Sequence, residues 1–177
     1  MSVPEWMLKL GIPANCVSQK TAVKENQQRF SVRPCRGEVE DKIWSVQVDG
    51  CWLKSEDGKK IDYLFWIDGT DGRTIVLLVE LKGEDYKKAL QQIEATLQRL
   101  CKLADGHGIH TGDHRSAPRH FAPSAGGVKA YVVLSRGNEV AKQQAYAERL
   151  RRKYGVIVIP HSQQLEIDLD RPTSQHS

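Results

Sequence analysis

Apolar and polar residues alternate through residues 43–82, which is the pattern of β-strands with one face buried. Three strands are expected, over 43–53 with an irregularity at Gly50, over 61–67 and over 74–82. Short polar segments rich in Gly and Asp separate them, so we expect an antiparallel meander. The run Ile75–Val79 is apolar on both sides of its strand, which indicates a strand covered on both faces.

The period changes to that of a helix after Lys82, because the next apolar residues recur three or four positions apart. This stripe consists of Tyr86, Leu90, Ile93, Leu97, Leu100 and Ala104. Further along, we expect a strand over 128–134, a helix from Asn138 to about Lys153, a strand over 154–159 closed by Pro160, and an edge strand at Leu165, Ile167 and Leu169. The strand–helix–strand unit should be a right-handed crossover that places its strands parallel.

The first forty residues are less clearly patterned. A short helix is expected over 2–11, whereas residues 14–41 allow a helix across Lys20–Gln28 and an extended segment over Phe30–Arg33. The chain as a whole predicts an α/β protein, with a mixed sheet of about five strands flanked by helices. Its 177 residues suit one domain over residues 1–170, with a mobile loop at 105–127 and a disordered tail at 171–177.

Composition and charge narrow the class of protein. The 26 basic and 22 acidic residues leave a net charge of +4, a mild bias that is compatible with a polyanionic partner. No apolar run approaches the ~20 residues of a membrane span, and residues 1–11 lack the features of a secretory signal. The four cysteines are far apart and form no CxxC pair, which predicts reduced thiols in a cytoplasmic protein.

Asp62, Glu80 and Lys82 are the candidate reactive residues. If the turn between the second and third strands is centred on Asp71, Asp62 faces Glu80 directly, and Lys82 lies on the same face two residues further on. A shift of one residue would separate the three side chains. Exposed Glu–Lys pairs on strands are common, but these charges lie within strongly apolar strands, where charged side chains are unexpected.

Two facing carboxylates repel each other, and a divalent cation would offset that repulsion. Carboxylate oxygens suit Mg²⁺ or Mn²⁺, and the backbone carbonyl of Leu81 could supply a further ligand. Lys82 could then polarise a water molecule or stabilise the charge that develops at a phosphorus centre. The pattern therefore indicates a metal site suited to phosphodiester hydrolysis.

The segments Ile61-Asp62-Tyr63 and Val79-Glu80-Leu81-Lys82-Gly83 resemble the PD-(D/E)XK nuclease superfamily, with Ile61 in place of its proline. This superfamily includes restriction endonucleases, Holliday-junction resolvases and many repair and phage-defence nucleases. The resemblance implies a restriction-endonuclease-like αβββαβ core and Mg²⁺-dependent DNA cleavage. It assigns Asp62 and Glu80 as the acids and Lys82 as the lysine. On the following helix it points to Gln92, with Gln91 as second choice, and Glu38 and Glu40 are candidates for a further acid.

Contacts to nucleic acid are expected from two basic segments. The loop at 105–127 carries Arg115 and Arg119 among four histidines whose spacing matches no standard zinc finger. Arg151 and Arg152 end the predicted helix at 138–153, where the helix dipole also favours cations. The chain has little room for a separate recognition domain, so sequence-specific recognition would require a homodimer, a partner subunit or this loop.

Two other functions stay open at this point. The same fold could serve as a non-catalytic module that binds nucleic acid or protein, because a fold does not determine a function. A nuclease acting on RNA or on cyclic oligonucleotides would use the same acids and lysine.

Overall fold

In the computed structural model, the described part of the chain comprises residues 3–4, 7–8, 10–34, 43–54, 58–68, 74–82, 85–106, 128–134 and 140–169. Residues 2, 5, 6 and 9 of the helix expected over 2–11 lie outside it, as do the candidates Glu38, Glu40, Arg115 and Arg119, residues 107–127 of the loop expected at 105–127, and the tail at 171–177.

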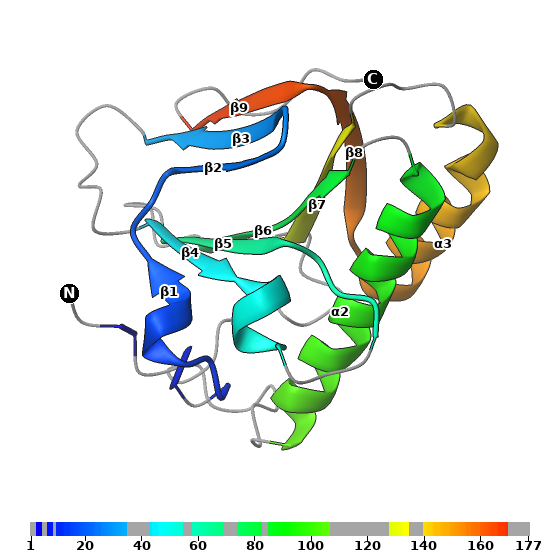
Figure 1. The fold of residues 1–177 in the computed structure, drawn as a ribbon. Helices are drawn as coiled ribbons and strands as arrows, with labels where there is room; N and C mark the ends of the chain where they lie inside the picture. Colours follow the sequence, from blue (N-terminus) through cyan, green and yellow to red (C-terminus); the bar gives the residue numbers. More distant parts are fainter. Residues whose placement is uncertain are drawn as a thin grey trace.

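The centre of the molecule is a six-stranded mixed sheet with the strand order β1-β4-β5-β6-β7-β8 (Figure 1). Its strands are β1 (Val17–Ser18), β4 (Ile43–Gln47), β5 (Tyr63–Asp68), β6 (Thr74–Lys82), β7 (Val128–Leu134) and β8 (Ile157–Ser162). The expected antiparallel meander is confirmed for β4, β5 and β6. Strands β6, β7 and β8 run parallel, as expected for segments joined through helices.

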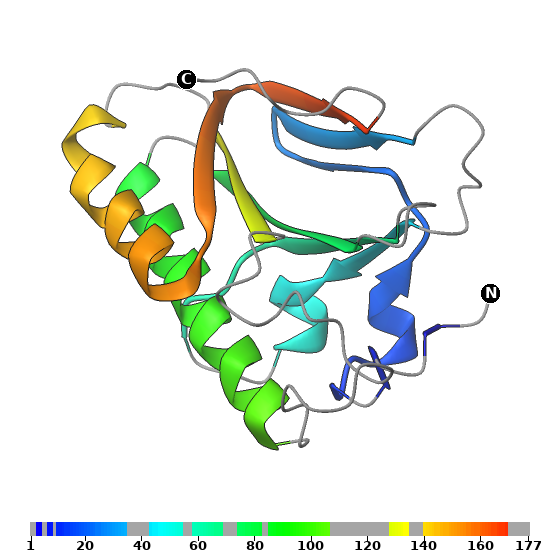
Figure 2. The same ribbon diagram turned by 180° about the vertical axis from the view of Figure 1, so that it is seen from behind.

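Helices cover one face of this sheet and a second sheet covers the other (Figures 1 and 2). The helices are α2 (Tyr86–Gly106) and α3 (Gln144–Tyr154), and the second sheet contains β2 (Ala22–Glu25), β3 (Gln28–Arg33) and β9 (Gln164–Asp168). Leu78 packs into the core on the helix side, whereas its neighbours Leu77 and Val79 pack against the second sheet. Burial on both faces explains the continuous apolar run in β6.

Local signals account for the helix ends. The expected apolar stripe is buried in α2 from Tyr86 to Leu100, and Asp85 caps the first turn by accepting a hydrogen bond from the Lys88 N–H at 2.8 Å. Helix α3 ends at Gly155, whose left-handed φ of 66° favours glycine and whose N–H bonds the Arg151 carbonyl. A 3-10 turn, η4 (Ala141–Gln143), precedes α3.

The structure corrects several strand and helix boundaries. Residues 20–28 are not helical: β2 and β3 form a hairpin there, joined through Asn26 with φ 51°. The strand expected over 43–53 ends at Gln47 and gives way to an irregular helical turn, η3 (Val48–Trp52), because Gly50 adopts φ 76°. Pro160 lies inside β8, which tolerates proline because it is an edge strand.

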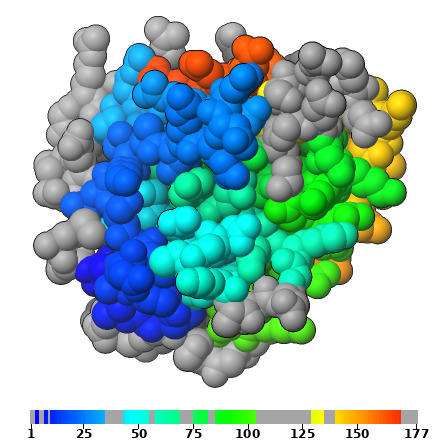
Figure 3. Space-filling view, in the orientation of Figure 1, coloured from blue at the N-terminus to red at the C-terminus, as the bar shows by residue number. Residues whose placement is uncertain are grey.

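The prediction of four reduced cysteines is wrong for two of them. Cys16, in the 3-10 turn η1 (Ala14–Cys16), forms a disulfide with Cys51 in η3. The two residues are 35 apart in sequence, but pairing of β1 with β4 brings their segments together, and Figure 3 shows these blue and cyan segments meeting at the surface. Cys101 forms no disulfide, and Cys35 lies outside the described residues.

This disulfide removes the cysteine-based argument for a cytoplasmic protein, since such bonds persist in oxidising compartments. The compartment stays a prediction. Among the described helices, none has the length and apolar character needed to cross a membrane.

A carboxylate between the two helices provides a pH-dependent prediction. Glu94 of α2 accepts hydrogen bonds from the Tyr146 hydroxyl at 2.7 Å and from Arg149 at 2.9 Å, and lies 3.7 Å from the Lys153 ammonium. Burial alone would raise the pKa of Glu94, but the Tyr146 hydrogen bond and the two cations outweigh it, so the pKa falls below its ordinary value of 4.5.

We expect Glu94→Gln to lower the free energy of unfolding by about 1–2 kcal/mol at pH 7. The folded-state pKa is depressed, so this contribution is present above the unfolded-state pKa and is lost as the pH falls through the folded-state value. Urea unfolding of the variant and the wild type between pH 3 and pH 7 measures it. Glu148→Gln, which removes only exposed ion pairs on α3, is the control and should have almost no effect.

Candidate functional site

Asp62 and Glu80 converge at one end of the β5–β6 hairpin. The strands pair Tyr63 with Val79, and this register places Asp62 opposite Glu80 as the sequence predicts. The Asp62 N–H donates to Glu80 Oε2 at 3.2 Å, and the Leu81 N–H donates to Asp62 Oδ2 at 2.7 Å. Asp62 is 8% exposed and Glu80 is 0% exposed, so two carboxyl groups meet in a buried position.

The alternation along β6 decides which face carries them. Leu78, two residues before Glu80, belongs to the core beneath the helices, so Glu80 lies on the helix-facing side of the sheet. Lys82, two residues after Glu80, occupies a position on the same face of β6. Its backbone pairs with Leu134, a residue of the core beneath the helices. The side chain of Lys82 lies outside the described part of the chain.

The turn η3 holds the strand end that carries Asp62. The Val48 N–H donates to the Asp62 carbonyl at 2.9 Å. Lys60 donates to the Leu53 carbonyl at 2.8 Å and lies 3.5 Å from the Asp49 carboxylate. These contacts fix the approach to β5 from one side.

Helix α2 holds the same segment from the other side. Gln92 Nε2 donates to the Lys60 carbonyl at 2.7 Å, and the Ile61 N–H donates to Thr96 Oγ1 at 3.1 Å. Lys59 Nζ also donates to Gln91 Oε1. Gln92 is 6% exposed, and its Oε1 accepts no hydrogen bond from the residues that the structure describes.

Thr96 is a site residue that our sequence analysis did not single out. It is 1% exposed and lies on the apolar stripe of α2, three residues after Ile93 and one before Leu97. The sequence signal for Thr96 was its position as a polar residue on the apolar stripe of a helix. A polar group buried there needs a hydrogen-bond partner inside the protein.

Tyr63, the first residue of β5, responds to the charges around it. Its pKa is raised first by burial and then by the negative charges of Glu25 and Asp62. The phenol therefore stays protonated, and neutral, at physiological pH.

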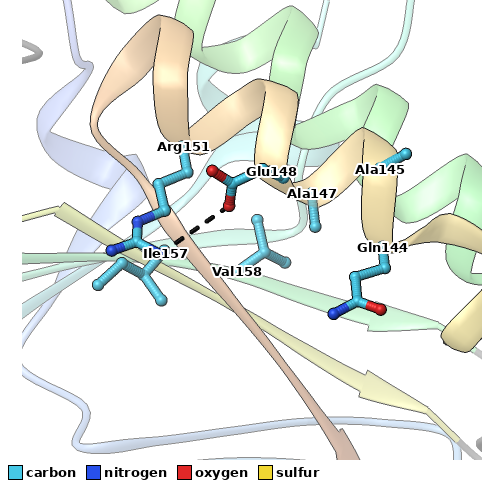
Figure 4. Close-up of a pocket in the computed structure, with 7 residues that line it drawn as sticks. All are labelled: Gln144, Ala145, Ala147, Glu148, Arg151, Ile157 and Val158. Atoms are coloured by element: carbon cyan, nitrogen blue, oxygen red, sulfur yellow. Dashed lines mark ion pairs between the residues drawn. The ribbon is translucent and has the colours of Figure 1, made fainter. Parts of the chain in front are cut away.

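The structure brings together Asp62, Glu80 and the Leu81 backbone, and Gln92 contacts the Lys60 carbonyl two residues before Asp62. Arg151 and Arg152 instead lie exposed on α3, within 3.9 Å and 3.3 Å of Glu148. Figure 4 shows Arg151 and Glu148 at a shallow pocket whose described lining residues come from α3 and β8. Ile157, 43% exposed, forms part of its floor.

Metal ligation would rest on few side chains. In the described ranges, no group of three or more His, Cys, Asp or Glu side chains is placed to hold a metal ion. Asp62 and Glu80 contribute two carboxylates, and the sequence-predicted third ligand is the backbone carbonyl of Leu81. Comparison with known proteins adds no assignment, because no protein-family model, no curated protein and no solved structure matches this chain.

Proposed function

We propose that this protein is a Mg²⁺-dependent nuclease that hydrolyses phosphodiester bonds of DNA. The observation that carries the proposal is the convergence of Asp62 and Glu80 in a buried position at the end of a hairpin. Buried carboxylates are costly unless they are paired, hydrogen-bonded or bound to a metal. The wall provided by α2 adds Gln92, whose buried Oε1 is a further oxygen acceptor.

The donor set fits a hard divalent cation. Asp62 and Glu80 offer carboxylate oxygens, which Mg²⁺ and Mn²⁺ both accept as ligands. The Leu81 N–H points towards Asp62, and the carbonyl of a strand residue points to the same neighbouring strand as its N–H. The Leu81 carbonyl is therefore directed towards the side of the strand that carries Asp62, which supports its assignment as a ligand.

The proposed roles follow from these positions. Asp62, Glu80 and the Leu81 carbonyl would hold the cation, which when bound activates a water molecule for attack on phosphorus. Lys82 would assist the attacking water or stabilise the charge that develops on the phosphate. Gln92 would orient the site or the scissile strand. The order of β4, β5, β6, α2 and β7 supports a restriction-endonuclease-like core, the αβββαβ arrangement that the motif implies.

DNA is the preferred substrate, and RNA or cyclic oligonucleotides are the alternatives for the same acids. Arg151 and Arg152 on α3 would contact phosphates, together with Arg115 and Arg119 of the loop at 105–127. Recognition of a specific sequence would use a homodimer or a partner subunit. A cytoplasmic location would suit this substrate.

The first test is a substrate panel. Purified protein incubated with Mg²⁺ should cleave at least one of single-stranded, double-stranded and branched DNA, and EDTA should abolish the cleavage because the carboxylates then lack their cation. Gel electrophoresis of the labelled substrates measures it. Cleavage of RNA alone would redirect the proposal to the alternative substrate, and cleavage that persists in EDTA would overturn it.

A non-catalytic binding module is the second candidate, favoured by the hydrogen bonds that link each carboxylate to a backbone N–H of the other segment. These hydrogen bonds give both carboxylates a structural role that requires no metal ion. Calorimetric titration with Mn²⁺ separates the two functions, since a nuclease of this design binds the ion and a module that uses the acids only for structure does not.

A further inference from the structure

The Lys60–Ile61 peptide, one peptide before the one that joins Ile61 to Asp62, is held at both of its polar atoms by α2. The Lys60 carbonyl accepts a hydrogen bond from Gln92 Nε2 at 2.7 Å, and the Ile61 N–H donates to Thr96 Oγ1 at 3.1 Å. The carbonyl and the N–H belong to the same peptide group. Two side chains four residues apart on one helix therefore fix the orientation of a single peptide plane.

The geometry of both partners makes this arrangement possible. In a trans peptide the C=O and the N–H point in opposite directions. Side chains at positions i and i+4 of a helix lie on one face, about 5–6 Å apart at Cβ. Gln92 and Thr96 can therefore reach the two ends of a peptide that lies along the helix surface.

Packing alone does not explain these two residues. Gln92 is 6% exposed and Thr96 is 1% exposed, in contact with a core where apolar side chains would avoid the cost of burying polar groups. Gln92 Nε2 and Thr96 Oγ1 both bond the Lys60–Ile61 peptide, and Ile61 directly precedes Asp62. Rotation of that peptide would displace Asp62, whose carboxylate accepts a hydrogen bond from the Leu81 N–H at 2.7 Å.

We propose that Gln92 and Thr96 form a peptide clamp that sets the position of the Asp62 carboxylate for cation binding. This inference rests on the proposed function and adds Thr96 as a positioning residue. The clamp uses only the amide nitrogen of Gln92, and Gln92 Oε1 accepts no hydrogen bond from the described residues.

The test compares two variants. Thr96→Val keeps the shape of the side chain and loses the oxygen that accepts the hydrogen bond, whereas Thr96→Ser keeps that oxygen. Amide hydrogen exchange without metal is followed at Ile61, at Leu81 and, as an internal reference, at Val79. In Thr96→Val we expect exchange at Ile61 and Leu81 to rise at least tenfold relative to Val79, and the Kd for Mn²⁺ to rise at least tenfold. In Thr96→Ser the relative exchange rates and the Kd for Mn²⁺ should stay close to those of the wild type.

A loss of overall stability would accelerate all three amides together, so the ratio to Val79 separates positioning from unfolding. Gln92→Met provides a second variant, matched by Gln98→Met at an exposed position of the same helix, and only the first should weaken Mn²⁺ binding. Unchanged exchange at Leu81 in Thr96→Val would overturn the clamp whatever the wild type binds. A wild type that binds no Mn²⁺ would instead overturn the proposed function, and with it the clamp's role in cation binding.

Discussion

Asp62→Asn and Glu80→Gln will each lower the rate of Mg²⁺-dependent DNA cleavage by about a thousandfold or more, because each removes a charged ligand from the proposed cation site. Both substitutions keep the size of the side chain and an oxygen that can accept the backbone N–H hydrogen bonds at 2.7 Å and 3.2 Å. The fold should therefore persist. The rate of cleavage of the preferred substrate and the Kd for Mn²⁺ measure the effect.

Two comparisons make this prediction specific. Glu166→Gln changes an exposed carboxylate that pairs with Arg33 on the second sheet, and its cleavage rate should match the wild type. Lys82→Ala should abolish cleavage while leaving Mn²⁺ affinity nearly unchanged, since an ammonium is not a ligand. Full activity of Asp62→Asn or Glu80→Gln would contradict the assignment of these acids.

Loss of the Cys16–Cys51 disulfide will lower the free energy of unfolding by about 3–4 kcal/mol, the entropic contribution expected for a closed loop of this length. The bond closes a segment of 35 residues between η1 and η3. We expect Cys51→Ser, or the wild type in a reducing agent, to unfold at a lower urea concentration. Urea unfolding followed by circular dichroism measures the difference.

Cys101 offers the matched control for the disulfide. Cys101→Ser changes a half-buried cysteine of α2 that forms no disulfide, so reducing agent should destabilise this variant as much as the wild type. In Cys51→Ser the reducing agent should have no further effect. Equal stability of the oxidised and reduced wild type would show that the bond contributes little to the fold.

Strong local patterns explain why much of the fold could be predicted from the sequence. The boundaries of β6 and β7 match their predicted ranges, and α2 begins at Tyr86 as its apolar stripe indicates. The register of β5 against β6 is the one expected for a turn centred on Asp71, because the centre of a short turn determines which residues face each other.

The segment at 14–34 could not be predicted in the same way. Strand β3 pairs in parallel with β9, so that Arg33 lies beside Asp168. Residues so distant in sequence leave no local signal of their pairing, and the helical interpretation of 20–28 rested on local propensity alone. The disulfide was missed for the same reason, since only the pairing of β1 with β4 brings its cysteines within a Cα separation of 5.6 Å.

The amino-acid sequence by itself determined the two acids, their spacing and the hairpin that makes them face each other, because strand alternation and turn length are local properties. Tertiary structure decided that both carboxyl groups are buried and that Gln92 and Thr96 hold the Lys60–Ile61 peptide. Those features depend on α2 packing across the sheet. Contacts between a helix and a distant loop are set by the assembled core, which no short stretch of sequence encodes.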